Sequence, residues 1–96
     1  MQNYEGVFIF NPDLSQEVSK GIVVQLQELV TKNGGRVDGI QEWGRRRLAY
    51  RIKKKQDGNY VVFNFQIEPG QTKKFEQALR LNDHLLKFLL VNKEKI

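Results

Sequence analysis

The spacing of hydrophobic side chains along the first third of the chain predicts a strand followed by a helix. Residues 4–10 (YEGVFIF) are rich in aromatic and β-branched side chains, and turn-forming residues follow at positions 11–13, which is typical of a short strand. Apolar side chains then recur every three or four positions through residues 14–32, which predicts an amphipathic helix. Asp13, placed three residues before Gln16, and Ser15 are alternative N-caps. Asn33-Gly34-Gly35 supplies the residues that commonly end a helix.

The middle third of the chain predicts a β-hairpin whose first strand changes phase. Leu48, Tyr50 and Ile52 alternate cleanly, so we expect Tyr50 to be at least half buried, but the apolar residues before Gly44 do not share their parity. We therefore expect a β-bulge at Gly44 within a strand over residues 36–52. Residues 53–58 (KKKQDG) predict a polar turn that ends in Asp-Gly. The returning strand, residues 60–67, has one fully apolar face, made of Val61, Phe63, Phe65 and Ile67.

The last third predicts a helix over residues 72–81 and a mostly apolar strand over residues 85–91. The order β-α-β-β-α-β predicts an α+β, ferredoxin-like domain over residues 1–96, in which a four-stranded antiparallel sheet carries two helices on one face. The other face of the sheet is expected to be bare. An exposed face with apolar and aromatic side chains is a candidate binding surface, although scattered hydrophobic residues need no partner. We place Val7, Ile9, Tyr60 and Val62 on this face.

Composition excludes several classes of protein. The 96 residues include no cysteine and one histidine, so they hold no disulfide, no thiolate metal site and no pair of histidine ligands. No apolar stretch approaches the roughly 20 residues of a membrane span. The start, MQNYEG, lacks the pattern of a signal peptide. We therefore expect a small soluble intracellular domain that needs no cofactor.

The positive charge is concentrated in one segment. The chain has a net charge of +5, and residues 36–55 hold eight basic side chains against two acidic ones, a local net charge of +6. The remaining residues, with eight basic and nine acidic side chains, have a net charge of −1. A concentrated block of this kind favours a polyanionic partner such as a nucleic acid. The alternative is a charged hairpin that only discourages edge-to-edge pairing of strands.

Signals for catalysis are weak. No glycine loop precedes a helix in the way that a phosphate-binding loop requires. Asp13 lies near the end of the first strand, where small ferredoxin-like nucleases can hold a metal, but its role as a cap or turn residue already explains it. His84 lies in a predicted turn before the last strand. Residues 57–63 (DGNYVVF) match the aromatic signature of the RNA-recognition motif poorly, because the aromatic is out of register by one position.

The segment WGRRRLAYRI at residues 43–52 is the most specific motif of the chain. Arginine suits bidentate binding of phosphate and can also stack on bases. With Tyr4-Glu5, Asn11-Pro12 and the turn Arg80-Leu81-Asn82-Asp83, this segment resembles the bacterial small-subunit ribosomal protein six family over the whole chain. Three features depart from the pattern of that family. Gln2-Asn3 replaces a basic residue, Arg51 stands in place of the usual proline, and the long acidic tail of some members is absent.

The resemblance implies a ferredoxin-like protein of the cytoplasmic ribosome that catalyses no reaction. Members of the family bind the central domain of small-subunit ribosomal RNA during assembly, together with small-subunit ribosomal protein eighteen. The matching positions in this chain include Arg46, Arg47, Leu48 and Tyr50 in the first motif and Arg80 in the second.

From the charge pattern and the resemblance together we assign candidate sites. The candidates for contact with ribosomal RNA are Arg45, Arg46, Arg47, Lys53, Lys54, Arg80 and Lys87. The candidates for contact with the partner protein are Trp43, Tyr50 and Tyr60, because aromatic residues are enriched in interfaces. Three alternatives stay open: a standalone RNA-binding module, a metal-dependent nuclease, and a homo-oligomeric regulatory domain.

Overall fold

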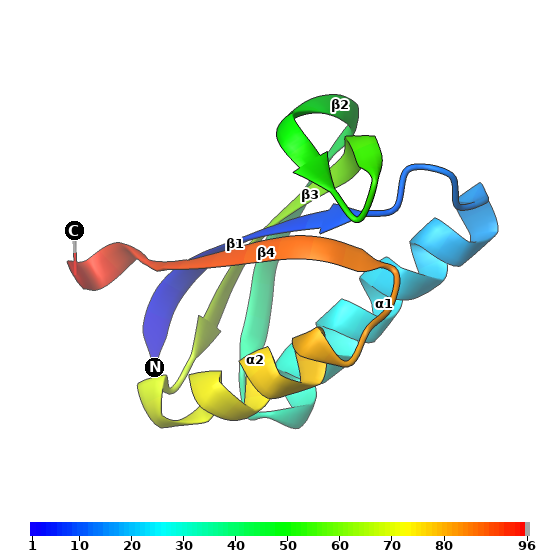
Figure 1. The fold of residues 1–96 in the computed structure, drawn as a ribbon. Helices are drawn as coiled ribbons and strands as arrows, with labels where there is room; N and C mark the ends of the chain where they lie inside the picture. The colour runs from blue at the N-terminus through cyan, green and yellow to red at the C-terminus, as the bar shows by residue number, and fades with distance from the viewer. Residues whose placement is uncertain (96) are drawn as a thin grey trace.

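A computed structural model describes residues 1–95 as one sheet with two helices packed against one of its faces (Figure 1). The predicted order β-α-β-β-α-β is confirmed. The elements are β1 (Gln2–Phe10), α1 (Gln16–Lys32), β2 (Arg36–Ile52), β3 (Lys55–Ile67), α2 (Thr72–Arg80) and β4 (Leu85–Asn92), with short 3₁₀ turns at Pro69–Gln71 and Lys93–Lys95. The strands lie in the order β2-β3-β1-β4, and each neighbouring pair is antiparallel. This is the predicted ferredoxin-like arrangement.

The main core lies between the sheet and the helices. The apolar face of β3 packs with Phe8 and Phe10 of β1 against Ile22, Leu26 and Val30 of α1 and Phe75 and Leu79 of α2. The ring of Phe8 meets that of Phe63 edge-on, at 5.2 Å between centroids. Most of the predicted helical stripe is thus the buried face of α1, whereas its first residue, Val18, is 42% exposed.

The N-terminus of α1 is capped by Ser15 and not by Asp13. The Oγ of Ser15 accepts a hydrogen bond of 3.3 Å from the backbone N–H of Val18. Asp13 lies two residues before this cap, and its carboxylate accepts a hydrogen bond of 2.6 Å from Lys55. The capping box with Asp13 is therefore wrong, because a tertiary contact takes its carboxylate.

The turn of the β2–β3 hairpin is shorter than predicted. It consists of Lys53 and Lys54, whose φ angles of 50° and 67° are left-handed, and β3 begins at once with Lys55. Asp57 and Gly58 lie inside β3, where they pair with Arg47 and Arg46 of β2, so the predicted Asp-Gly turn is wrong. Gly58 is buried under Ile9, and this packing holds it in the sheet.

The bulge at Gly44 is confirmed; an earlier register shift lies between Val37 and Gly39, and a wider bulge follows Gly44. Gly44 has a φ of 79°, and the register of β2 against β3 shifts between Glu42 and Gly44. Farther along, Arg47 pairs with Asp57 and Ile52 pairs with Lys55, so four residues of β2 lie opposite one residue of β3. We call residues 48–51 the wide bulge.

The wide bulge partly covers the face of the sheet that was expected to be bare. Leu48 is 9% exposed, and it lies with Ile9 against Gly58 on the face away from the helices. Ile9 and Val62 are 8% and 3% exposed on this same face. In Figure 1 the end of β2 curls above β1 and β4, on the side opposite the helices. The expectation of a fully bare face was wrong, because the hairpin bends back over the sheet.

Candidate nucleic-acid interface

The first part of the candidate site is a stack of side chains on the helix-free face. The ring of Trp43 lies nearly parallel to that of Tyr60, with 6.5 Å between centroids and an angle of 11°. The guanidinium of Arg46 lies 5.1 Å from the centroid of Trp43, which is a cation–π distance. Trp43 also donates a hydrogen bond of 3.3 Å from Nε1 to Gln41. The stack therefore joins two predicted partner-binding residues and one predicted RNA-binding residue.

The bulge at Gly44 makes this stack possible. Tyr60 pairs with Gly44 in the sheet, so no side chain of β2 stands directly opposite its ring. The extra residue of the bulge is Trp43, which consequently turns toward Gln41 and Tyr60. The indole is 46% exposed and presents an aromatic surface to solvent.

The second part of the site is a contact between Tyr50 of the wide bulge and Lys87 of β4. The Nζ of Lys87 donates a hydrogen bond of 2.8 Å to the Tyr50 hydroxyl and lies 5.3 Å from the centroid of its ring. This hydrogen bond raises the pKa of Lys87 above its ordinary value. Tyr50 is 61% exposed, so the prediction that it is at least half buried was wrong. The wide bulge removes it from the sheet, and Leu48 fills the buried position.

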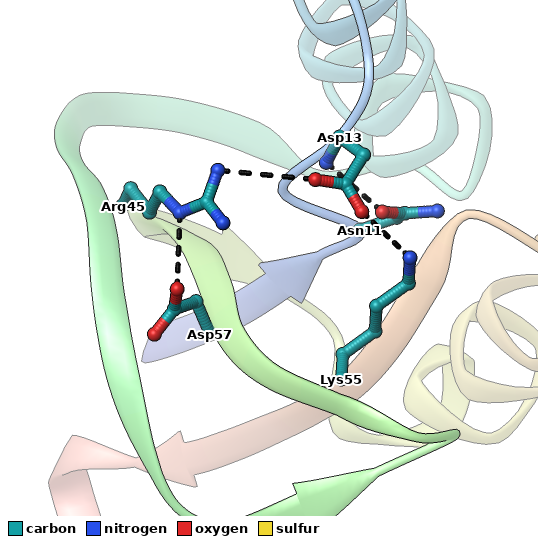
Figure 2. A network of polar contacts seen from close by, with 5 residues as sticks. All are labelled: Asn11, Asp13, Arg45, Lys55 and Asp57. Carbon is teal, nitrogen blue, oxygen red and sulfur yellow. Dashed lines mark hydrogen bonds and ion pairs between the residues drawn. The ribbon is translucent and has the colours of Figure 1, made fainter.

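Arg45 lies in a network of ion pairs on the other side of the hairpin, and Figure 2 shows it between two carboxylates. Its Nε binds Asp57 at 3.1 Å, and its Nη1 is 3.8 Å from Asp13, which also binds Lys55. The hydrogen bond from Lys55, with its charge, lowers the pKa of Asp13 below its ordinary value. Arg45 and Lys55 thus tie the hairpin to the segment between β1 and α1. Because its guanidinium is already paired with two carboxylates, Arg45 is less available to bind a phosphate than Arg46 or Arg47.

Two further predicted cations lie at the free edge of β4. Lys53 reaches the start of this strand, where its Nζ donates a hydrogen bond of 3.4 Å to the carbonyl of Leu85. The guanidinium of Arg80 lies 6.0 Å from the ring centroid of Phe88. Lys53, Arg80 and Lys87 line one groove of about 480 Å³ along residues 85–90. The fold therefore brings Lys53 of the hairpin to Arg80 and Lys87, which lie much later in the sequence.

The remaining candidates, Arg47 and Lys54, are exposed on the hairpin. Sequence reasoning did not select Arg51, which is also exposed and lines a small pocket together with Arg47. Its position within the basic segment, residues 36–55, could have identified it as a candidate for RNA binding. Lys54 lies at the tip, where its charge faces solvent.

The part of the chain that the structure describes holds neither a cluster of metal-binding side chains nor a helix suited to crossing a membrane. Within residues 1–95, no three His, Cys, Asp or Glu side chains come together as a metal site would require. No helix in the same range is long and apolar enough to cross a membrane. Asp13, the candidate metal ligand of a nuclease, is occupied by Lys55 and Arg45.

Comparisons with known proteins agree with this architecture. The model of the family described as ribosomal protein S6 matches residues 3–92. Small ribosomal subunit protein bS6 of Clostridium novyi is 40% identical over 95 residues, which cover 99% of this chain and 100% of the relative. The protein of the same name from Caldanaerobacter subterraneus is 36% identical over 95% of this chain and 96% of its own length. The crystal structure of 30S ribosomal protein S6 from Thermotoga maritima shares the fold, with a TM-score of 0.92 at 23% identity, covering 98% of this chain and 89% of the other.

Proposed function

The chain belongs to the ribosomal protein S6 family, and from this premise we propose that it binds the central domain of small-subunit ribosomal RNA jointly with small-subunit protein eighteen. As a member of the family it is a protein of the small ribosomal subunit in the bacterial cytoplasm. Its proposed role is structural: it holds RNA and a partner protein together during assembly and catalyses no reaction.

The observation that carries the proposal is the division of the basic segment between two faces. Arg46 lies on the aromatic surface of Trp43 and Tyr60, on the helix-free face. Arg45 and Arg47 pair with Asn59 and Asp57 at alternate positions, so they point the other way. A surface of stacked aromatic rings and one arginine has the composition of a protein interface. We assign the helix-free face to the partner protein.

The proposed contacts with RNA phosphates are the cations outside this face and Lys87, which lies on the helix-free face beside Tyr50 at the sheet edge. Lys53, Arg80 and Lys87 flank the edge of β4, and Arg47 and Lys54 extend along the hairpin. Arg45 stays in the proposed set, but we expect it to contribute least because Asp57 and Asp13 share its charge. We expect Arg46 to act in both roles, since it lies at the border between the aromatic surface and the hairpin.

The test is a binding measurement with a fragment of the central domain, with and without the partner protein. RNA affinity is expected to be weak for the chain alone and to rise when the partner is present. If about four cations engage phosphates, the log–log salt dependence of the joint binding has a slope of about −3 to −3.5. A slope near zero would contradict the electrostatic part of the proposal. Tight binding by the chain alone would instead favour a standalone RNA-binding module.

Single alanine variants then separate the two surfaces. Arg80→Ala is expected to weaken RNA binding and to flatten the salt slope by about one unit, with little change in affinity for the partner. Trp43→Ala is expected to weaken the pairing with the partner and to leave the salt slope nearly unchanged. The control is Lys32→Ala, since Lys32 is exposed in the last turn of α1; Lys20 is unsuitable, because it lines a pocket together with Trp43. If Arg80→Ala and Trp43→Ala behave like this control in both measurements, the assignment of the surfaces is wrong.

A further inference from the structure

The wide bulge forms a small pocket that lies outside the regular sheet pairing and outside the hydrophobic core. Residues 48–51 of β2 stand opposite Gln56 alone, so their backbone leaves the regular ladder of the hairpin. The space that results has a volume of about 230 Å³ and is lined by Arg47, Arg51, Gln56 and the residues between the two arginines. This volume is below the roughly 300 Å³ at which pockets for drug-sized ligands begin. It suits one small chemical group.

The charge around this pocket favours an anion. Arg47 and Arg51 are both exposed, and no carboxylate lines the space. Asp57, the nearest acidic residue by register, pairs with Arg47 in the sheet, but its Oδ2 binds the Nε of Arg45 at 3.1 Å. Within the described residues, neither Arg47 nor Arg51 has an ion-pair partner. Arginine presents its donors in a planar fork that matches the oxygens of a phosphate.

The backbone that forms the pocket is held in place before any ligand arrives. Leu48 is buried against the sheet, and the hydroxyl of Tyr50 is bound by Lys87 of β4. At the other end, Lys53 and Lys54 adopt left-handed angles, which non-glycine residues adopt only where the surrounding structure compensates for the strain. The backbone of the wide bulge is thus fixed at three points, so the ordering cost of binding falls mainly on the side chains of Arg47 and Arg51.

We propose that this pocket binds one phosphate group of an RNA backbone, with Arg47 and Arg51 clamping it from either end of the wide bulge. The inference rests on the proposed function and deepens it, because it adds Arg51 to the binding residues and makes two arginines act on the same group. A phosphodiester is favoured over an isolated carboxylate of a protein, since residues 36–55 have a net charge of +6 and suit a chain of repeating negative charges.

The first test is a double-mutant cycle on RNA affinity, measured with the partner protein present. Arg47→Ala and Arg51→Ala are each expected to weaken binding about tenfold or more, as the loss of a charge-assisted hydrogen bond does. The double variant is expected to lose much less than the product of the two factors, because one arginine alone no longer clamps the group. The matched control is Arg36→Ala, an exposed arginine of the same strand that pairs with Asp38.

Three outcomes of the cycle would overturn the proposal. Losses that multiply fully would mean that the two arginines bind separate phosphates. Losses no larger than that of Arg36→Ala would mean that the pocket does not contact RNA. A loss of affinity for the partner protein, with RNA binding by the assembled pair unchanged, would mean that the pocket holds a carboxylate of the partner.

The second test uses inorganic phosphate without RNA or partner and follows the protein by NMR. Titration at constant ionic strength, balanced with chloride, is expected to shift the Nε–H signals of Arg47 and Arg51 and the side-chain amide of Gln56 together. Arg51→Ala is expected to abolish the shift of Arg47, whereas Arg36→Ala leaves it intact. Equal shifts of all exposed arginines would mean that phosphate binds the arginines non-specifically, and would contradict a specific site in the pocket. If the wild-type chain fails to bind RNA even with the partner protein present, the proposed function fails, while this titration still decides whether the pocket binds phosphate.

Discussion

Substitution of Gly58 by alanine tests whether the contact between the wide bulge and the sheet holds the hairpin in place. A Cβ atom at this position would lie 2.3 Å from Cγ2 of Ile9 and 3.2 Å from Cδ2 of Leu48, well inside the roughly 3.5–4.0 Å of a favourable carbon contact. Both neighbours are buried, so neither can move without disturbing its own packing. Overpacking of this kind costs about 1–3 kcal/mol. For a domain of this size, each kcal/mol lowers the Tm by about 4–8 °C.

The assay is thermal unfolding of single and double variants. Ile9→Ala removes the Cγ2 atom that causes the shorter contact, so the double variant Gly58→Ala/Ile9→Ala is expected to be more stable than the sum of the single effects predicts. Gly39→Ala is the control, because Gly39 lies in β2 with no atom within 4 Å of an added Cβ, and it is expected to leave the Tm unchanged or slightly raised. Strict additivity, or an equal response of Gly58→Ala and Gly39→Ala, would refute the reasoning.

Three further predictions concern the bulge, the ion pairs and the Lys87 contact. Gly44→Val is expected to cost at least about 1 kcal/mol in chemical unfolding through its left-handed φ of 79°, since an added Cβ meets open space; an unchanged midpoint would contradict this. Because Lys55 lowers the pKa of Asp13, the ion pair stabilises the fold above the ordinary pKa of 3.8, and this stabilisation is lost as the pH falls through the lower pKa of the folded state. Asp13→Asn is expected to remove this part of the pH dependence of Tm. Identical profiles of Tm against pH for the variant and the wild type would contradict a contribution from this ion pair. In Tyr50→Phe the pKa of Lys87, followed by NMR, is expected to fall toward its ordinary value, and an unchanged titration would mean that the hydroxyl is not the cause.

The sequence alone was sufficient to predict the strands and helices and their order along the chain. The spacing of Ile22, Leu26 and Val30 and the alternation from Val61 to Ile67 each predicted a buried face, and the structure buries both. The phase break at Gly44 also predicted a bulge, because the side chains of a strand can change face only where the backbone is irregular. These features depend on local geometry, which a periodic pattern records directly.

The details of the candidate site depended on contacts that no local pattern contains. Alternation placed Tyr50 with Leu48, but the wide bulge separates them: Leu48 is buried and Tyr50 is exposed beside Lys87. Strand alternation separates Arg46 from Arg45 and Arg47, but it does not separate Arg45 from Arg47. Of these two arginines, only Arg45 forms ion pairs with carboxylates from other parts of the chain, those of Asp13 and Asp57.

The turn between β2 and β3 illustrates the same limit. Asp57-Gly58 has the composition of a hairpin turn, but Gly58 is needed inside the sheet, where Ile9 leaves no room for a Cβ. The chain turns instead at two lysines, whose left-handed angles the surrounding contacts must compensate. Sequence patterns determined which segments form strands and helices. The tertiary structure decided which charges remain free and which face of the sheet is covered, because both depend on residues that meet only after the chain has folded.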